Sequence, residues 1–138
     1  MLVRSTAVGL TLLEVLVVIL VLGVAAAVAV PFWQQHRVRL HRVDARTELQ
    51  STAERLAGCF ARLNVYDNQA CTVALPVTTA ASTYRLSGEI LAGSFKLSAQ
   101  PLGEQVADRD CGVFFLDDRG RQRVSGRLSA EECWRAVD

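Results

Sequence analysis

The first quarter of the chain carries one long hydrophobic segment. From Leu10 to Trp33, Thr11 and Glu14 are the only side chains that are neither apolar nor glycine or proline. At about 1.5 Å of rise per residue, a helix over this segment spans roughly 36 Å, more than the ~30 Å hydrocarbon core of a bilayer. The pattern predicts a transmembrane helix over residues 10–33.

The pattern then becomes amphipathic from Gln34 to about Leu63. Apolar positions recur at three- and four-residue steps, which indicates one buried stripe on a helix. Charged side chains lie off this stripe, where we expect them to be solvated. No turn signal interrupts the segment from Pro31 to Arg55, so we expect one long helix, with its first half in lipid and its second half packed on a domain. The stripe consists of Val38, Ala45, Leu49, Thr52, Leu56, Phe60 and Leu63, and the charged positions are Arg37, Arg42, Arg46, Glu48 and Arg55.

The remainder of the chain is rich in β signals. A short apolar run, residues 72–75, ends at Pro76, and residues 78–82 read as a loop. Alternating or apolar runs bounded by glycine, proline and aspartate then predict antiparallel strands that cover the helix stripe. The fold class is therefore α+β, with three or four strands. The expected strands are residues 84–87, 94–99, 112–116 and 121–125, the last two joined by a turn at 117–120.

Length and charge narrow the function classes only slightly. The 138 residues allow one globular domain beyond the apolar segment, and a net charge of +1 favours neither nucleic acids nor acidic partners. The four cysteines allow two disulfides in three connectivities, which the sequence leaves open. Pairing nearest neighbours, Cys59–Cys71 and Cys111–Cys133, would close two modest loops. Zinc is disfavoured, because no C-x-x-C or C-x-x-H pair occurs.

The remaining candidate chemistry has simpler interpretations. The arginines at the start of the amphipathic helix could contact lipid phosphates or DNA, but a solvated helix face just outside a membrane is the simpler explanation, so DNA binding is not supported. The aspartates Asp108, Asp110, Asp117 and Asp118 could bind calcium, but turn chemistry accounts for them. His36 and His41 do not share a helical face. Without a nucleophile motif or phosphate loop, we expect no enzyme activity, metal, cofactor or small-molecule substrate.

Glu14 is the unusual residue of the apolar segment. A carboxylate near the end of a membrane helix is costly and usually serves a specific purpose. It belongs to the stretch Gly9-Leu10-Thr11-Leu12-Leu13-Glu14, which follows a short leader containing Arg4. This stretch resembles the class III signal of type IV pilins and pseudopilins. The resemblance implies that a prepilin peptidase cuts between Gly9 and Leu10 and that Leu10 is then N-methylated. Leucine replaces the phenylalanine more usual at that position.

The resemblance also implies how subunits assemble. The match continues through Gly23 and Pro31, and the stretch between them would lose its helix inside a filament. The new amine of one subunit would meet Glu14 of a neighbour, because pairing offsets the cost of a carboxylate in hydrocarbon. Thr11, Glu14, Gly23 and Pro31 are the expected assembly residues.

Two other interpretations of the N-terminus remain. One is an ordinary secretory leader cleaved near Ala27-Val28-Ala29, and the other is a plain single-pass anchor. Counting charges near the membrane even favours the reverse orientation, because Arg37, Arg39, Arg42 and Arg46 outnumber Arg4. The cleavage motif and the cysteines outweigh that count. The expected boundaries are a leader at 1–9, a transmembrane and filament-core segment at 10–33 and a periplasmic head at 34–138.

A narrower resemblance covers the head. The segments 84–86, 95–101 and 110–117, with Gly120 and the closing Cys133-Trp134, resemble the PilE-type minor pilins of twitching bacteria. This implies that Cys111 and Cys133 bound a C-terminal disulfide loop. It also implies a minor pilin of the bacterial inner membrane that enters or primes a pilus with other major and minor pilins. Roles in twitching, adhesion or DNA uptake come from resemblance alone. The alternatives are a major pilin, a type II secretion pseudopilin, and a membrane-anchored periplasmic binding domain.

Overall fold

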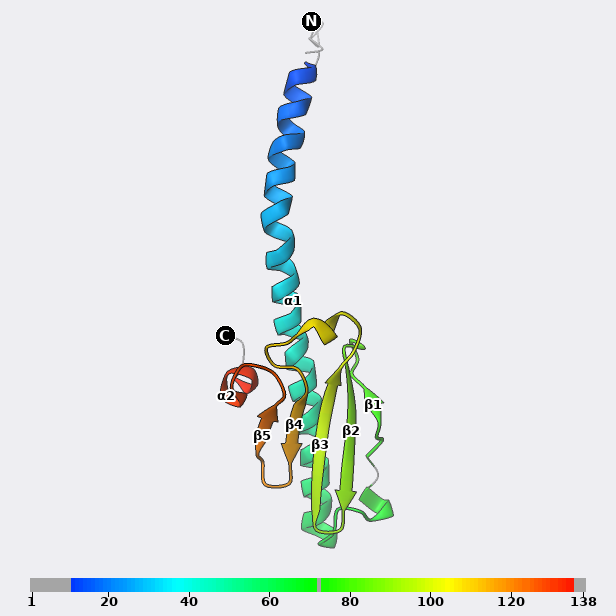
Figure 1. Ribbon diagram of the computed structural model, residues 1–138. Coiled ribbons are helices and arrows are strands. Elements are labelled where there is room, and N and C mark those ends of the chain that lie inside the picture. Colours follow the sequence, from blue (N-terminus) through cyan, green and yellow to red (C-terminus); the bar gives the residue numbers. More distant parts are fainter. Residues whose placement is uncertain (1–10, 72, 136–138) are drawn as a thin grey trace, which may run out of the picture. The chain divides into compact units, whose positions relative to one another are not determined.

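The computed structural model describes residues 11–71 and 73–135 and divides into two compact units, Met1–His36 and Arg37–Asp138 (Figure 1). The first unit contains the start of α1 (Leu12–Leu63), which remains helical through Gly23 and Pro31. The rest of α1 belongs to the second unit. That unit also contains η1 (Gln69–Cys71), β1 (Val77–Thr78), β2 (Tyr84–Leu91), β3 (Ser94–Pro101), η2 (Gly103–Ala107), β4 (Phe114–Asp117), β5 (Gln122–Val124) and α2 (Ala130–Trp134).

The second unit is built on an antiparallel sheet of five strands in the order β1-β2-β3-β4-β5. The predicted α+β class is confirmed, but the sheet has one strand more than expected. The extra strand is β1, in which Thr78, expected in a loop, pairs with Arg85. The strand β2 is also longer than predicted and runs through Gly88. A side chain at Gly88 would collide with Leu97, so this glycine allows close packing within the sheet rather than ending the strand.

The core lies between the sheet and the C-terminal half of α1, which runs behind the strands in Figure 1. Four residues of the predicted helix stripe, Ala45, Leu49, Thr52 and Leu56, are buried. They face alternate residues of the strands, because successive side chains of a strand point to opposite sides. Val38 and Phe60 are only half-buried, and Leu63 is exposed at the helix end. The inner sheet face contributes Tyr84, Leu86, Phe95, Leu97, Ala99, Phe114 and Leu116.

The C-terminal region contains a helix that the sequence analysis missed. Ser129 caps α2: its side chain accepts a hydrogen bond from the Glu132 N–H, and the Glu132 carboxylate accepts one from the Ser129 N–H. This reciprocal pair is a capping box, and the S-x-x-E spacing was visible in the sequence. The hydrogen-bonded helix brings Cys133 and Trp134 into the core.

Two disulfides link elements of the second unit. Cys59 of α1 is bonded to Cys71 of η1, and Cys111 is bonded to Cys133 of α2, which is the nearest-neighbour connectivity. By the loop-entropy argument, each bridge contributes on the order of 3 kcal/mol. The first bridge ties the connection after α1 to the helix end, and the second encloses β4 and β5 and ties α2 to the start of β4.

Candidate functional site

The residues expected to direct assembly belong to the first unit. Gly9 and Leu10, with the predicted cleavage between them, lie outside the described residues. At the start of α1, the Thr11 hydroxyl accepts a hydrogen bond from the Glu14 N–H at 3.2 Å, which caps the helix. The side chains that follow are exposed, from Leu12 at 83% to Trp33 at 64%.

This apolar segment needs a partner that the described residues do not supply. The described residues contain one helix long and apolar enough to cross a bilayer, and the hydrophobic part of that helix is unburied. Exposed apolar surface on this scale marks contact with lipid or with other proteins. Gly23 and Pro31 both lie within this part of the helix.

An ion pair in the second unit joins α1 to the segment after η2. Arg42 Nε and Nη2 donate to the two carboxylate oxygens of Asp108 at 2.7 and 2.8 Å, a bidentate arrangement. The Asp108 side chain is only 1% exposed and that of Arg42 13%. Burial opposes the guanidinium charge, but the bonds to Asp108 and its negative charge outweigh burial and raise the pKa of Arg42.

Arg46, one turn further along α1, is buried beside this pair. Its guanidinium donates to the carbonyls of Arg42 and Arg135, so it ties α1 to the end of α2. Burial, followed by the charge of Arg42, lowers the pKa of Arg46. The expectation that Arg42 and Arg46 are solvated was therefore wrong. The segment after η2 supplies the partner of Arg42, and Arg135 at the end of α2 supplies one acceptor for Arg46.

The buried amide of Gln105 extends the same network. Its Nε2 donates to the Tyr84 hydroxyl at 2.9 Å and to the Val38 carbonyl at 3.1 Å. Burial, partly offset by the bond from Gln105, raises the pKa of Tyr84 to about 12. Helix, sheet and η2 are thus joined by satisfied polar groups, which specify one arrangement of these elements.

The same aspartate positions the start of the C-terminal disulfide loop. Asp108 Oδ1 accepts the N–H groups of Asp110 and Cys111, both at 3.2 Å. The backbone of Asp110 then passes so close to Gly126 that no side chain fits there. Asp110 itself reaches Arg127 at 3.0 Å. The loop from Cys111 to Cys133 is therefore anchored at its base.

Three of the aspartates considered as calcium ligands, Asp108, Asp110 and Asp117, take part in turns and ion pairs. Asp117 accepts the N–H groups of Arg119 and Arg121 and pairs with the Arg121 side chain at 2.7 Å. Within residues 11–71 and 73–135, no three acidic, histidine or cysteine side chains gather to hold a metal ion. His41 lies beside Asp44, 3.7 Å away.

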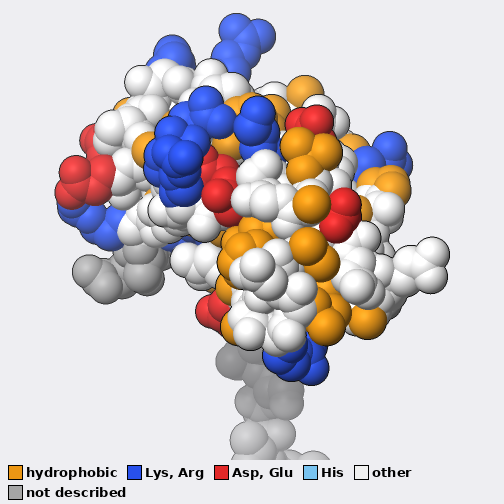
Figure 2. Space-filling view, turned by 90° about the horizontal axis from the view of Figure 1, so that it is seen from below, with side chains coloured by type: hydrophobic (Ala, Val, Ile, Leu, Met, Phe, Trp, Pro, Cys, Tyr) orange, Lys and Arg blue, Asp and Glu red, His pale blue; other side chains and the backbone are white. Residues whose placement is uncertain are grey.

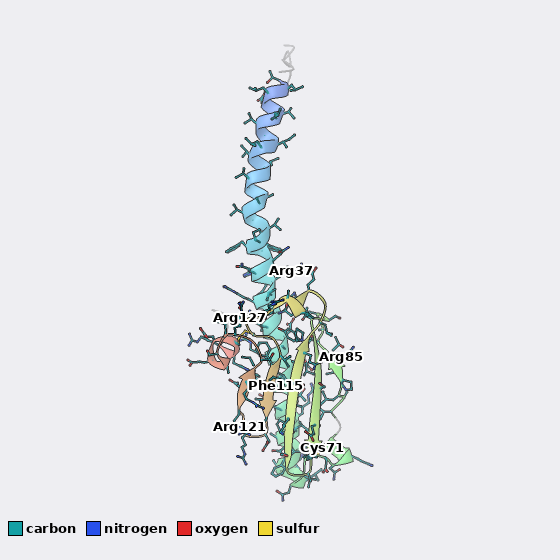
Figure 3. All side chains as sticks on the ribbon, in the orientation of Figure 1. Arg37, Cys71, Arg85, Phe115, Arg121 and Arg127 are labelled. Carbon is teal, nitrogen blue, oxygen red and sulfur yellow. A yellow bond between two sulfur atoms is a disulfide. The ribbon has the colours of Figure 1, made fainter. Side chains whose placement is uncertain are left out.

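The sheet face turned away from α1 carries charged and hydroxyl side chains around one aromatic ring. Figure 3 shows Phe115 near the middle of this face, between Arg85 on one side and Arg121 at the β4–β5 turn. Phe115 is half-buried, whereas its neighbour Phe114 is completely buried in the core. Both rings belong to the expected strand 112–116, and the sequence pattern did not separate them.

Hydrophobic side chains are exposed at the end of the second unit where α1 and β2 finish. Figure 2 shows hydrophobic side chains in a band there, beside neighbouring basic and acidic groups. Leu63 and Leu91 are the exposed large apolar residues at these element ends. The backbone N–H of Tyr66 donates to the Ala92 carbonyl, which closes this end.

Comparison with known proteins places these features in a family. A family model described as type IV minor pilin ComP, DNA uptake sequence receptor, matches residues 31–115. None of the curated proteins compared with the chain matches it. The matched range covers the C-terminal half of α1, strands β1 to β3 and the first residues of β4. The family match, the long apolar helix packed at its C-terminal half on an antiparallel sheet, and the two disulfides agree with one another: the chain belongs to this family of type IV minor pilins.

Proposed function

We propose that this minor pilin is a DNA-binding subunit of a pilus that takes up DNA. The observation that carries the proposal is the match to a DNA-receptor pilin family over most of the second unit. Its role is binding and assembly rather than catalysis. The family match also favours a minor pilin over a major pilin or a secretion pseudopilin.

The route to the pilus follows from the N-terminal segment. We propose that residues 1–9 form a leader removed by prepilin peptidase, and that residues 10–33 hold the protein in the inner membrane. The head, residues 34–138, then lies in the periplasm until the subunit joins other pilins. The exposed apolar stretch of α1 supports this route, because exposed apolar surface on this scale is covered by lipid or by other proteins.

Charge on the head must act locally if it is to bind DNA. From Arg37 to Asp138 there are 14 Lys and Arg residues and 13 Asp and Glu residues, so no strong overall field attracts a polyanion. Ion pairs such as Arg42–Asp108 and Arg121–Asp117 remove one cation for each acid, so they leave this balance unchanged. Exposed cations without such partners remain available to DNA phosphates.

Equilibrium binding of DNA by the full chain tests this function. The purified protein in neutral detergent micelles would be titrated into fluorescent duplex and single-stranded DNA while anisotropy is followed. We expect saturable binding that weakens as salt is raised, because phosphate contacts release counterions. Protein-free micelles provide the control. If neither form of DNA binds at low salt, the proposed function is wrong.

A further inference from the structure

Two arginines at the start of the second unit are exposed and unpaired. No acidic group lies within 4.0 Å of Arg37 or Arg39 in the part of the chain that the structure describes. The residues three and four positions away along α1, where a helical partner would lie, include no acid. Arg42 and Arg46, by contrast, are occupied by Asp108 and by backbone carbonyls. Arg37 and Arg39 are therefore the basic residues of this helical stretch that the fold does not use.

Both arginines follow the apolar segment closely along the helix. Arg37 and Arg39 come four and six residues after Trp33, which corresponds to about 6 and 9 Å of helix rise. The polar layer of a bilayer extends about 5–7 Å beyond the hydrocarbon on each side. An arginine side chain near the end of a membrane helix can extend along the helix while its charge stays in the polar layer. With residues 10–33 in the membrane, both guanidinium groups come within reach of lipid phosphates.

The helix η2 brings an exposed apolar side chain to the same level. Gln105 donates from Nε2 to the Val38 carbonyl at 3.1 Å, so η2 lies beside the turn of α1 that carries the two arginines. Figure 1 shows η2 at the end of the second unit where its part of α1 begins. Val106, the next residue of η2, is 62% exposed. Apolar side chains exposed beside basic ones are typical of surfaces that lie on a membrane interface.

The charges of this end favour an anionic partner. Arg109, which follows η2, is a further exposed cation with no acidic group within 4.0 Å among the described residues. Glu104 is the exposed acid of η2. Basic residues next to a membrane helix normally remain on the cytoplasmic side, so these arginines are unusual in the proposed orientation. Anionic lipid headgroups would give the charges a counterpart at this place.

We propose that Arg37 and Arg39 bind the phosphates of anionic phospholipids, and that Val106 rests on the same membrane surface, before the subunit joins a pilus. The inference rests on the proposed membrane insertion of residues 10–33 and is independent of DNA binding. Guanidinium groups suit this role because their planar fork donates two parallel hydrogen bonds to phosphate oxygens. DNA would also pair with the arginines, but it would leave Val106 in water, whereas a lipid surface accommodates both.

The lipid preference of the full chain in bilayers tests the two arginines. The protein would be reconstituted into phosphatidylcholine vesicles with increasing fractions of brominated phosphatidylglycerol or brominated phosphatidylcholine, and quenching of Trp33 would be followed. We expect wild type to favour phosphatidylglycerol about fivefold or more at low salt. Arg37→Gln/Arg39→Gln should reduce the preference to near one, and Arg37→Lys/Arg39→Lys should retain most of it. Arg55→Gln/Arg62→Gln, the same charge loss at exposed positions further along α1, should leave it unchanged.

A second measurement tests the position of η2. Val106→Trp and Leu91→Trp would be made separately in a Trp33→Phe background, and quenching by a lipid with a nitroxide on its headgroup would be compared. Leu91 is the matched control because it is also exposed, at the end of β2 far from η2. Trp134, buried in the core, contributes equally to both. We expect quenching at position 106 and little at position 91, and equal quenching would contradict contact between η2 and the membrane.

The other outcomes separate this inference from the proposed function. Equal association of both lipids with wild type, or an undiminished preference in Arg37→Gln/Arg39→Gln, would overturn the role of the arginines. If neither brominated lipid quenches Trp33, the proposed membrane insertion fails as well. A loss of DNA affinity in the glutamine variant without a change in lipid preference would mean that these arginines bind DNA instead. Thermal melting would verify folding. If the glutamine variant does not fold, the wild-type protein at high salt decides, because screening should abolish the preference and its persistence would overturn the inference.

Discussion

Single residues link the helix and the C-terminal loop of this pilin head. Asp108 accepts two bonds from Arg42 and two from the backbone at the start of the disulfide loop. Arg46 and Gln105 extend the connection to the end of α2 and to the sheet. Because each group is satisfied, removing one leaves another charge or dipole unpaired at low exposure. The network therefore fixes where the loop leaves the domain.

Replacing Asp108 with asparagine should destabilise the head. The amide keeps the size of the side chain but removes the bidentate counterion of Arg42 and leaves only Asp110, 3.9 Å away. We expect a loss of about 2–3 kcal/mol in the free energy of unfolding. Denaturant titration followed by near-UV circular dichroism would measure it. Asp67→Asn, at an exposed position, is the control. A change below about 0.5 kcal/mol at Asp108, similar to a surface substitution, would contradict the role of the pair.

The turn at Asp117 should make stability depend on acid pH. Burial disfavours its charge, but the N–H and guanidinium of Arg121 and the N–H of Arg119 outweigh burial and lower its pKa below the ordinary 3.8. A lowered folded-state pKa stabilises the protein above 3.8, and that contribution is lost as the pH falls from 3.8 through the folded-state value. Melting temperatures at decreasing pH should therefore fall less steeply for Asp117→Asn than for wild type. An identical pH dependence in both proteins would refute this, and Asp118→Asn serves as the comparison.

Elements differ in how far the sequence could predict them. The helix α1 was predicted to end near Leu63 and does. The helical spacing of apolar residues continues to Leu63, and the residues that follow do not extend the apolar stripe. The strand β1 and the helix α2 were missed. They have two and five residues and depend on contacts with distant elements, although the Ser129–Glu132 capping box was a usable signal. Short elements held by tertiary contacts leave little periodicity to detect.

The site shows the same limit more strongly. Arg42 and Asp108 are 66 residues apart, and no local sequence pattern predicts that they form an ion pair. The sequence therefore placed Arg42 on a solvated face. Alternation could have separated Phe115 from Phe114, but the apolar run from Val113 to Leu116 concealed it. Only the register with β3 and β5 reveals that Phe115 and Arg123 share the outward face.

At the start of α1, Glu14 should matter for assembly rather than for insertion. Glu14→Ala removes the carboxylate proposed to meet a neighbour's N-terminal amine, while the apolar segment remains long enough to cross the bilayer. We expect normal amounts in the membrane fraction but a severalfold loss from sheared pili, measured by quantitative mass spectrometry. The same spectra would show whether the mature protein begins at N-methylated Leu10. Leu16→Ala, an apolar truncation in the same segment, should incorporate normally. Normal incorporation of Glu14→Ala would defeat the proposed role of the carboxylate.

At the scale of the whole molecule, the two units have different surfaces and different proposed roles. The first presents an apolar helix that other pilins or lipid must cover, and the second carries a stapled head with exposed cations. The family match connects this architecture with pili that receive DNA. Assembly and DNA binding should therefore be separable, because different residues serve each.

Capture of fluorescent DNA by living cells is the most direct measurement of this account. In the source bacterium, deleting the gene should reduce DNA capture strongly while pili remain visible on the surface, and wild type supplied in trans should restore capture. Glu14→Ala supplied in trans should not restore it, since the head would be made but left out of the pilus. Undiminished capture by deletion cells that still carry pili would contradict the central claim.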